Sequence, residues 1–121
     1  MPESSIMSAL MGVIHQRRAC EPSEPSYVVT LMHGGLAKIG AKIVEEAAEV
    51  VEAGGEPGEA GRVHLTKEVA DLVFHTLVLL GCRDLDWSDV ESELARRFGI
   101  SGIAEKQARG TNRAEVHTPS E

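Results

Sequence analysis

Residues 67–80, KEVADLVFHTLVLL, place three titratable side chains on an otherwise apolar segment. At about 100° per residue of an α-helix, Glu68, Asp71 and His75 fall within one sector of roughly 60°. Apolar side chains cover most of the remaining circumference, which predicts a helix at the centre of a bundle or against another subunit. An unpaired ionised carboxylate in such a place costs several kcal/mol, so each acid must be paired, protonated or bound to a cation.

Length and composition predict one all-α domain. The 121 residues suffice for a single core, and 42% of them are apolar but only 3% aromatic, which suits packed helices better than a β-sandwich. The net charge of −7 argues against a general nucleic-acid binder, and an anionic substrate would need a cation beside it. Cys20 and Cys82 match no zinc or redox spacing, so we expect reduced thiols. Without a basic leader or an apolar run long enough to span a bilayer, the predicted location is the cytoplasm.

Breaks in the helical periodicity divide the sequence. Apolar positions at helical spacing predict helices over roughly residues 6–18, 27–53 and 62–80, and then a short helix that ends at Gly99. The stretch GGEPGEAG, residues 54–61, is predicted to be a loop that acts as a hinge. Short connections favour a four-to-five-helix bundle in which the second and third helices form an antiparallel hairpin. Residues 1–110 form the predicted domain, and residues 111–121, with little to bury, a disordered tail.

The second predicted helix carries the groups expected to face the acidic stripe. Its segment KIGAKIVEEAAEVVE places Lys42, Glu46 and Glu49 in one sector beside the apolar side chains. Glu45 and Glu52 lie farther round, toward solvent. If these sectors face each other in the hairpin, the acids that converge are Glu46, Glu49, Glu68 and Asp71. Carboxylates at hydrogen-bonding range cannot all stay ionised alone, and a divalent cation removes the conflict.

The type of ligand selects the ion. Carboxylates offer only oxygen, which favours Mg²⁺, with Mn²⁺ as a substitute, and Mg²⁺ typically completes its shell with water and substrate phosphate. No cysteine or paired histidine indicates zinc. A di-iron bundle needs a histidine three residues after a glutamate, but Glu68 is followed there by Asp71. The sequence therefore predicts a magnesium site between the two helices.

Simpler interpretations apply to some of these residues. Lys42 and Glu46 have the spacing of an ordinary surface pair on a helix, and Glu45 is as well explained by a solvated face as by a function. A single histidine inside a helix is more often a hydrogen-bonded core residue than a metal ligand. For His75 we predict support of Asp71 from one turn away.

The arrangement of the acids resembles a known signature. Glu46-x-x-Glu49, followed after 18 residues by Glu68-x-x-Asp71, is similar to the motif of the all-α nucleoside triphosphate pyrophosphohydrolase superfamily. Three segments further resemble, in order and register, the phosphoribosyl-ATP pyrophosphatase family of histidine biosynthesis: SYVVTLMHGGLAKIGAKIVEEAAEVV, EVADLVFHTLVLL and RFGISGIAEKQAR. The likeness covers about residues 6–110, and its Ser-Gly-Ile followed by Glu-Lys is a feature that general nucleotide-cleansing relatives do not share.

The resemblance implies interlocked helical dimers that split phosphoribosyl-ATP into phosphoribosyl-AMP and pyrophosphate. It makes the four converging acids the Mg²⁺ ligands and gives the proton of the attacking water to Glu45 or Glu46, with Lys42 beside them. The substrate-binding residues that it implies are Ser26, Tyr27, Lys42, Lys106 and Arg109.

Two other functions share parts of this pattern. A house-cleaning pyrophosphohydrolase for ordinary or damaged nucleotides would keep the acids but would not need residues 101–109. A non-catalytic dimerisation module would show no magnesium-dependent change in thermal stability. The chain departs from the family pattern at Val28, Thr30, Gly34 and Val44, and Thr30 stands where a lysine is usual.

Overall fold

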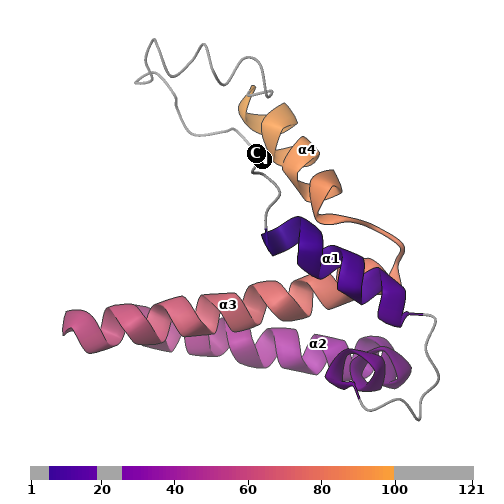
Figure 1. The fold of residues 1–121 in the computed structure, drawn as a ribbon. Coiled ribbons are helices and arrows are strands. Elements are labelled where there is room, and N and C mark those ends of the chain that lie inside the picture. Colours follow the sequence, from indigo (N-terminus) through magenta and orange to yellow (C-terminus); the bar gives the residue numbers. More distant parts are fainter. Residues whose placement is uncertain (1–5, 19–25, 100–121) are drawn as a thin grey trace. The chain divides into compact units, whose positions relative to one another are not determined.

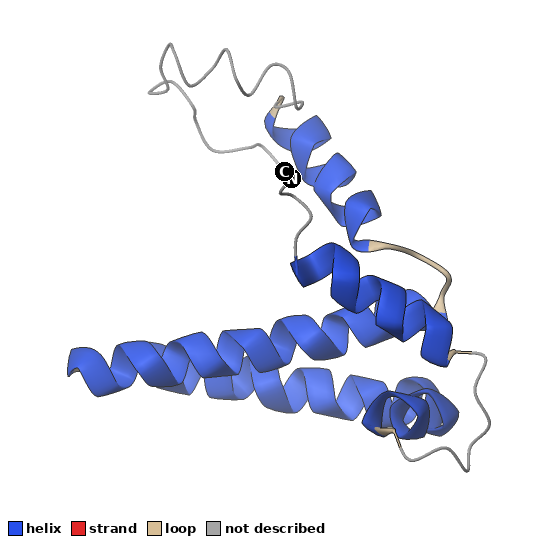
Figure 2. Ribbon diagram, in the orientation of Figure 1, coloured by secondary structure: helices blue, strands red, loops and turns tan. Residues whose placement is uncertain are grey.

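The computed structural model describes residues 6–18 and 26–99, and every regular element within them is an α-helix (Figure 2). The helices are α1 (Ile6–Arg17), α2 (Tyr27–Gly54), α3 (Gly58–Cys82) and α4 (Trp87–Phe98). The all-α prediction is thereby confirmed. The chain divides into two compact units, Met1–Asp86 and Trp87–Glu121, so α1 to α3 are described together and α4 by itself. None of the described helices is long and apolar enough to cross a membrane.

Helices α2 and α3 form the antiparallel hairpin predicted from the sequence (Figure 1). The Ser26 side chain caps α2 by accepting a hydrogen bond from the Val29 N–H at 3.3 Å. At the other end, the Gly55 N–H donates to the carbonyl of Glu52 at 3.1 Å and closes the last turn. Only residues 55–57 separate the two helices, and so short a connection makes them antiparallel neighbours.

The loop predicted over residues 54–61 exists but is shorter than predicted, since it comprises only residues 55–57. α2 continues to Gly54 and α3 already begins at Gly58, about one turn before the predicted start. Pro57 directly precedes the first turn of α3, where a missing N–H is no loss, and Glu59 lies where a helix N-terminus favours negative charge. Much of the glycine-rich stretch is therefore helical, and a hinge at residues 55–57 stays a prediction.

A kink at Gly35 interrupts α2, which the sequence had predicted as one continuous helix. Gly35 has φ 72° and ψ −167°, a conformation essentially restricted to glycine. The kink separates the first turns of α2 from the long segment that carries the acids.

The core of the first unit forms where α1 packs on α2 and α3 (Figure 1). Its largest fully buried side chains are Met11, Ile14, Val29, Leu31, Ile39, Leu77 and Val78. Close approach of α1 to α3 depends on Gly81, because a Cβ at this position would lie 2.5 Å from the Ile14 Cγ2. Asp71 precedes Gly81 by ten residues, about 15 Å along the helix, so the acids lie away from this contact.

The placement of α3 differs from one prediction. Asp71 is exposed, and Val63 and Val69 on the same helix are 45% and 39% exposed. Among the described residues of the first unit, α3 therefore has an exposed side and does not lie at the centre. Its packing against another subunit stays a prediction.

In the second unit, α4 is an amphipathic helix. Leu94 and Phe98, four residues apart on its apolar side, are 45% and 42% exposed. On the polar side, Arg96 Nε and Arg97 Nε each donate to the Glu93 carboxylate at 3.0 Å.

Candidate functional site

Three carboxylates from α2 and α3 meet across the hairpin. One oxygen from each of Glu46, Glu68 and Asp71 lies within 4.8 Å of the others. The spacing of Glu68 and Asp71 on α3 puts both on one face, and Glu46 reaches them from α2. Glu46 is 7% exposed, Glu68 is partly buried and Asp71 is exposed, so the cluster opens toward solvent on the Asp71 side.

Glu49, the fourth predicted acid, lies against Glu68. Its pKa is raised above the ordinary 4.5, first because its protonated form hydrogen-bonds to Glu68, then by burial and by the charge of Glu68. The charges of Glu45 and Asp71 add to the effect. The hairpin thus holds several carboxylates close together, and a bound proton or cation would reduce their mutual repulsion.

The cluster contains buried carboxylate oxygens that no described residue hydrogen-bonds. Among these residues, Glu46 Oε1 and Glu68 Oε1 are buried and have no hydrogen-bond partner. A buried acceptor without a partner costs about 1–3 kcal/mol, and more when it is charged. Mg²⁺ binds oxygen at about 2.1 Å, so its ligand atoms lie at most about 4 Å apart, and a small inward movement of these side chains would form such a site. The residues present fit a hard divalent cation.

The structure adds two residues that the sequence analysis had not selected. His64 Nδ1 lies 2.9 Å from Glu56 Oε1, and His64 Nε2 lies 3.1 Å from Glu68 Oε2. The pKa of His64 is raised above its ordinary 6.5, chiefly by the hydrogen bond to Glu56. The only signal in the sequence was the position of His64 four residues before Glu68, which places both on one face of a helix.

His75 contacts Asp71 through the main chain. Its buried ring lies with Nδ1 2.8 Å from the Asp71 carbonyl oxygen and Nε2 2.9 Å from the Tyr27 hydroxyl. Because a carbonyl only accepts, Nδ1 carries the proton, and Nε2 of the neutral ring accepts from Tyr27. The Tyr27 ring also stacks on Phe74, with centroids 6.1 Å apart. His75 thus acts as a hydrogen-bonded core residue whose hydrogen bond to Asp71 is made through the carbonyl oxygen.

The other predicted site residues have the following surroundings. Ser26 Oγ caps α2 and accepts a hydrogen bond from Arg17 Nη1 at 2.9 Å. Lys42 pairs with Glu45 at 3.4 Å rather than with Glu46, and the hydrogen bond to Glu45 raises the pKa of Lys42 above its ordinary value. Glu45 is exposed, in agreement with its predicted position toward solvent. The predicted tail lies outside the described residues, as do Cys20, Ser101, Lys106 and Arg109, for which the sequence made predictions.

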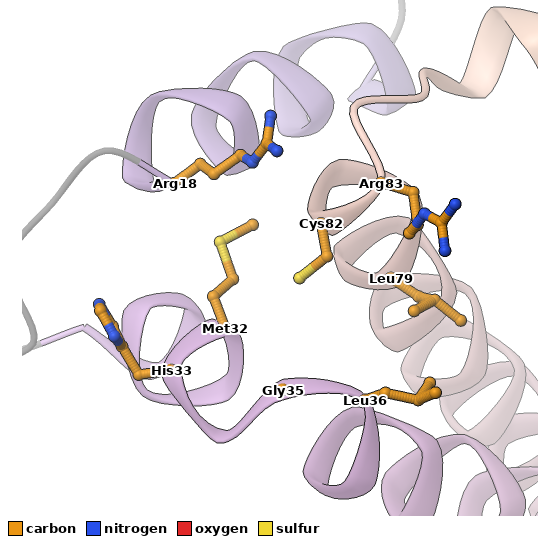
Figure 3. Close-up of a pocket in the computed structure, with 8 residues that line it drawn as sticks. All are labelled: Arg18, Met32, His33, Gly35, Leu36, Leu79, Cys82 and Arg83. Atoms are coloured by element: carbon orange, nitrogen blue, oxygen red, sulfur yellow. The ribbon is translucent and has the colours of Figure 1, made fainter.

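A separate cavity of about 530 Å³ lies beside the kink of α2. Its lining residues are Arg18, Met32, His33, Gly35, Leu36, Leu79, Cys82 and Arg83. Figure 3 shows Met32 from α2 and Cys82 from α3 pointing toward each other across it. Cys82 is a free thiol whose pKa is raised by burial, and Arg18 pairs with Asp84 at 3.3 Å. Leu79 follows Asp71 by eight residues, about 12 Å along α3, so the cavity is distinct from the carboxylate cluster.

Comparison with known proteins identifies the family. Residues 7–98 match the model of the phosphoribosyl-ATP pyrophosphohydrolase family. A phosphoribosyl-ATP pyrophosphatase of Rhodopirellula baltica is 46% identical over 109 residues, which are 90% of this chain and 91% of the relative. Enzymes of the same name from Neisseria meningitidis and Geotalea daltonii are 50% and 52% identical over 87% and 86% of this chain, and over 94% of each relative. The chain therefore belongs to the phosphoribosyl-ATP pyrophosphohydrolase family.

Proposed function

We propose that this protein hydrolyses phosphoribosyl-ATP to phosphoribosyl-AMP and pyrophosphate, the second step of histidine biosynthesis, at the carboxylate cluster between α2 and α3. The observation that carries the proposal is the convergence of Glu46, Glu68 and Asp71, with a buried Glu46 oxygen that has no partner among the described residues. The names of the relatives support the substrate. A location in the cytoplasm belongs to the same proposal.

The metal ligands in this proposal are Glu46, Glu49, Glu68 and Asp71, and the ion is Mg²⁺, with Mn²⁺ able to replace it. When bound, such an ion neutralises phosphate charge and makes an attacking water more acidic. Glu45, exposed beside the cluster, or Glu46 accepts the proton of that water. Lys42, whose protonated form Glu45 stabilises, offers its ammonium group to a phosphate oxygen. The bond that breaks is the anhydride between the α- and β-phosphates, and water supplies the oxygen that replaces the bridging oxygen on the attacked phosphorus.

We include a homodimer in the proposed active form because α2 exposes an apolar stripe. Leu36, Val44 and Val51 are 70%, 71% and 77% exposed and fall within a sector of roughly 80° on α2. Two small residues, Gly40 and Ala47, lie in the same sector. A second copy of the chain would remove this surface of α2 from water.

To test this proposal, the purified protein is incubated with phosphoribosyl-ATP or with each of a panel of nucleoside triphosphates, with and without Mg²⁺. The rate of pyrophosphate release is then measured. We expect magnesium-dependent release from phosphoribosyl-ATP. Asp71→Asn should lower the rate by at least about 100-fold, because it removes a ligand charge, whereas Asp89→Asn on α4 should not. Release only from common nucleotides would instead establish the house-cleaning activity.

Thermal unfolding separates catalysis from a purely structural role. An ion at about 100 times its Kd stabilises the folded state by about 2.7 kcal/mol. We expect Mg²⁺ to raise the Tm of the unaltered protein but not that of Asp71→Asn. Equal Tm values with and without Mg²⁺ in the unaltered protein would favour the non-catalytic dimerisation module.

A further inference from the structure

His64 links the start of α3 to the carboxylate cluster. It lies one turn before Glu68 on α3, and its ring reaches a carboxylate at each nitrogen. Nδ1 lies 2.9 Å from Glu56 Oε1, in the connection between α2 and α3, and Nε2 lies 3.1 Å from Glu68 Oε2. Two hydrogen bonds on opposite sides of an imidazole determine both the position and the rotation of the ring.

This arrangement divides the two oxygens of Glu68 between different tasks. Because a carboxylate only accepts, the His64 Nε2–H donates to Glu68 Oε2. The other oxygen, Oε1, is buried and has no hydrogen-bond partner among the residues described. Glu68 thus has Oε2 against His64 and a buried Oε1 that no described residue bonds, and one of its oxygens lies within 4.8 Å of an oxygen of Glu46 and of Asp71.

We propose that His64, itself held by Glu56, is a positioning residue that keeps Glu68 as a one-oxygen ligand aimed at the ion and thereby sets the affinity of the cluster for its divalent cation. The inference rests on the proposed metal site. Hydrogen-bond partners of metal ligands act in this way in general, and their loss weakens metal binding by about 10- to 100-fold. His64 touches neither the ion nor the reacting phosphate, so its effect belongs to metal affinity.

The structure offers a matched pair of variants. Glu56→Gln removes a charged acceptor from His64, whereas Glu59→Gln alters the same residue type three positions later. Glu59 is 81% exposed and pairs with Arg62 at 3.3 Å, away from the histidine. His64→Ala removes the donor to Glu68, and His64→Gln retains an amide N–H at the same position.

The experiment measures Mn²⁺ binding to each full-length purified variant by electron paramagnetic resonance, beside thermal unfolding of the metal-free proteins. We expect His64→Ala to raise the Kd for Mn²⁺ by about 10- to 100-fold, with smaller increases for Glu56→Gln and His64→Gln and none for Glu59→Gln. At saturating Mg²⁺, kcat of His64→Ala with phosphoribosyl-ATP should return to within about threefold of the unaltered enzyme, since the ligands themselves are intact.

The outcomes separate the two proposals. If the unaltered protein binds Mn²⁺ and both His64→Ala and Glu56→Gln bind it equally well, the positioning role is overturned and the metal site stands. A lower Tm with unchanged Kd would make the histidine a structural link only, which also overturns it. If the unaltered protein binds no Mn²⁺, the metal site and the positioning role fall together. Should His64→Ala not fold, Glu56→Gln and Glu59→Gln decide the question.

Discussion

Glu46 brings an ionisable group into the contact between two helices, beside the carboxylates of Glu68 and Asp71. Its side chain is buried, and Oε1 lacks a hydrogen-bond partner within the described part of the chain. The free energy of such a group depends on what approaches it, because the interior screens charge poorly. His75 shows the opposite solution, since both of its ring nitrogens are hydrogen-bonded. Glu46 thus has an acceptor available to a ligand, whereas both nitrogens of the buried His75 ring are already hydrogen-bonded.

Tyr27→Phe tests the closed network around His75. The variant keeps the ring that stacks on Phe74 but leaves His75 Nε2 buried without a donor. We expect a loss of about 1–3 kcal/mol in the free energy of unfolding, measured by urea denaturation. Thr30→Val on the same helix removes an exposed hydrogen bond to Ser26 and should change the value by less than about 0.5 kcal/mol. An equal, small effect for both variants would show that the Tyr27 hydroxyl contributes nothing.

Three of the described helices, α2, α3 and α4, each have a distinctive local feature. α2 bends at Gly35, and α3 gains its first turn from the glycine-rich stretch. α4 concentrates charge on its polar side, where Glu93 receives hydrogen bonds from two arginines. These features depend on short-range chemistry, so single substitutions should alter them without changing the fold.

Gly35→Ala tests the kink in α2. A Cβ at Gly35 would meet nothing within 4 Å, so the cost comes from the backbone, whose φ of 72° disfavours any other residue. We expect a loss of about 1–3 kcal/mol in the free energy of unfolding. Gly12→Ala also meets nothing within 4 Å but lies in a regular helix, where alanine should stabilise by about 0.5–1 kcal/mol. Stabilisation by both variants would mean that α2 is straight in solution.

The pH dependence of α4 follows from Glu93. Hydrogen bonds from Arg96, then from Arg97, lower the pKa of Glu93 from 4.5 to about 2. Because the folded-state pKa is depressed, this contribution to stability is complete above pH 4.5 and is lost as the pH falls toward about 2. We expect the Glu93 carboxyl carbon to titrate near pH 2 by nuclear magnetic resonance.

Replacing both arginines by glutamine should move the Glu93 titration toward 4.5, whereas Arg62→Gln on α3 should not move it. The side chains of Glu93, Arg96 and Arg97 are 43%, 70% and 51% exposed. We therefore expect 1 M salt to weaken the lowering of the Glu93 pKa. A midpoint near 4.5 in the unaltered protein would contradict the hydrogen bonds to Glu93.

For the whole molecule, the site and the proposed assembly use different sides of the same hairpin. The acids lie where α2 meets α3, and Leu36, Val44 and Val51 form the exposed stripe of α2. A dimer formed through that stripe would rigidify the helices that carry the ligands. Metal binding and association are therefore expected to support each other.

Val44→Asp combined with Val51→Asp tests this association. Two charges in the stripe would have to be buried at the interface, which costs several kcal/mol. We expect the mass in sedimentation equilibrium to fall from that of a dimer to that of a monomer, and the Tm to lose its dependence on protein concentration. Ser92→Asp adds a charge at an exposed site on α4 and should leave the mass unchanged. An unchanged mass for the double variant would place the interface elsewhere.

The periodicity of the sequence alone determined the helical class, the α2–α3 hairpin and the shared face of Glu68 and Asp71. These follow from local geometry, because the spacing of residues on a helix decides which side chains lie on one side. The prediction that Asp71 is buried was wrong for the described residues, where Asp71 is exposed. Helix periodicity does not say which side of α3 packs against a neighbouring element.

Only the tertiary structure decided which groups complete the cluster. It places Glu46 of α2 beside Glu68 and Asp71 of α3, and it brings the Tyr27 hydroxyl of α2 to Nε2 of the His75 ring on α3. Contacts of this kind depend on the register and rotation of two packed helices, and many pairs of residues satisfy the same local pattern. The free energy of packing side chains across the interface selects one pair among them, and that selection does not exist until the chain has folded.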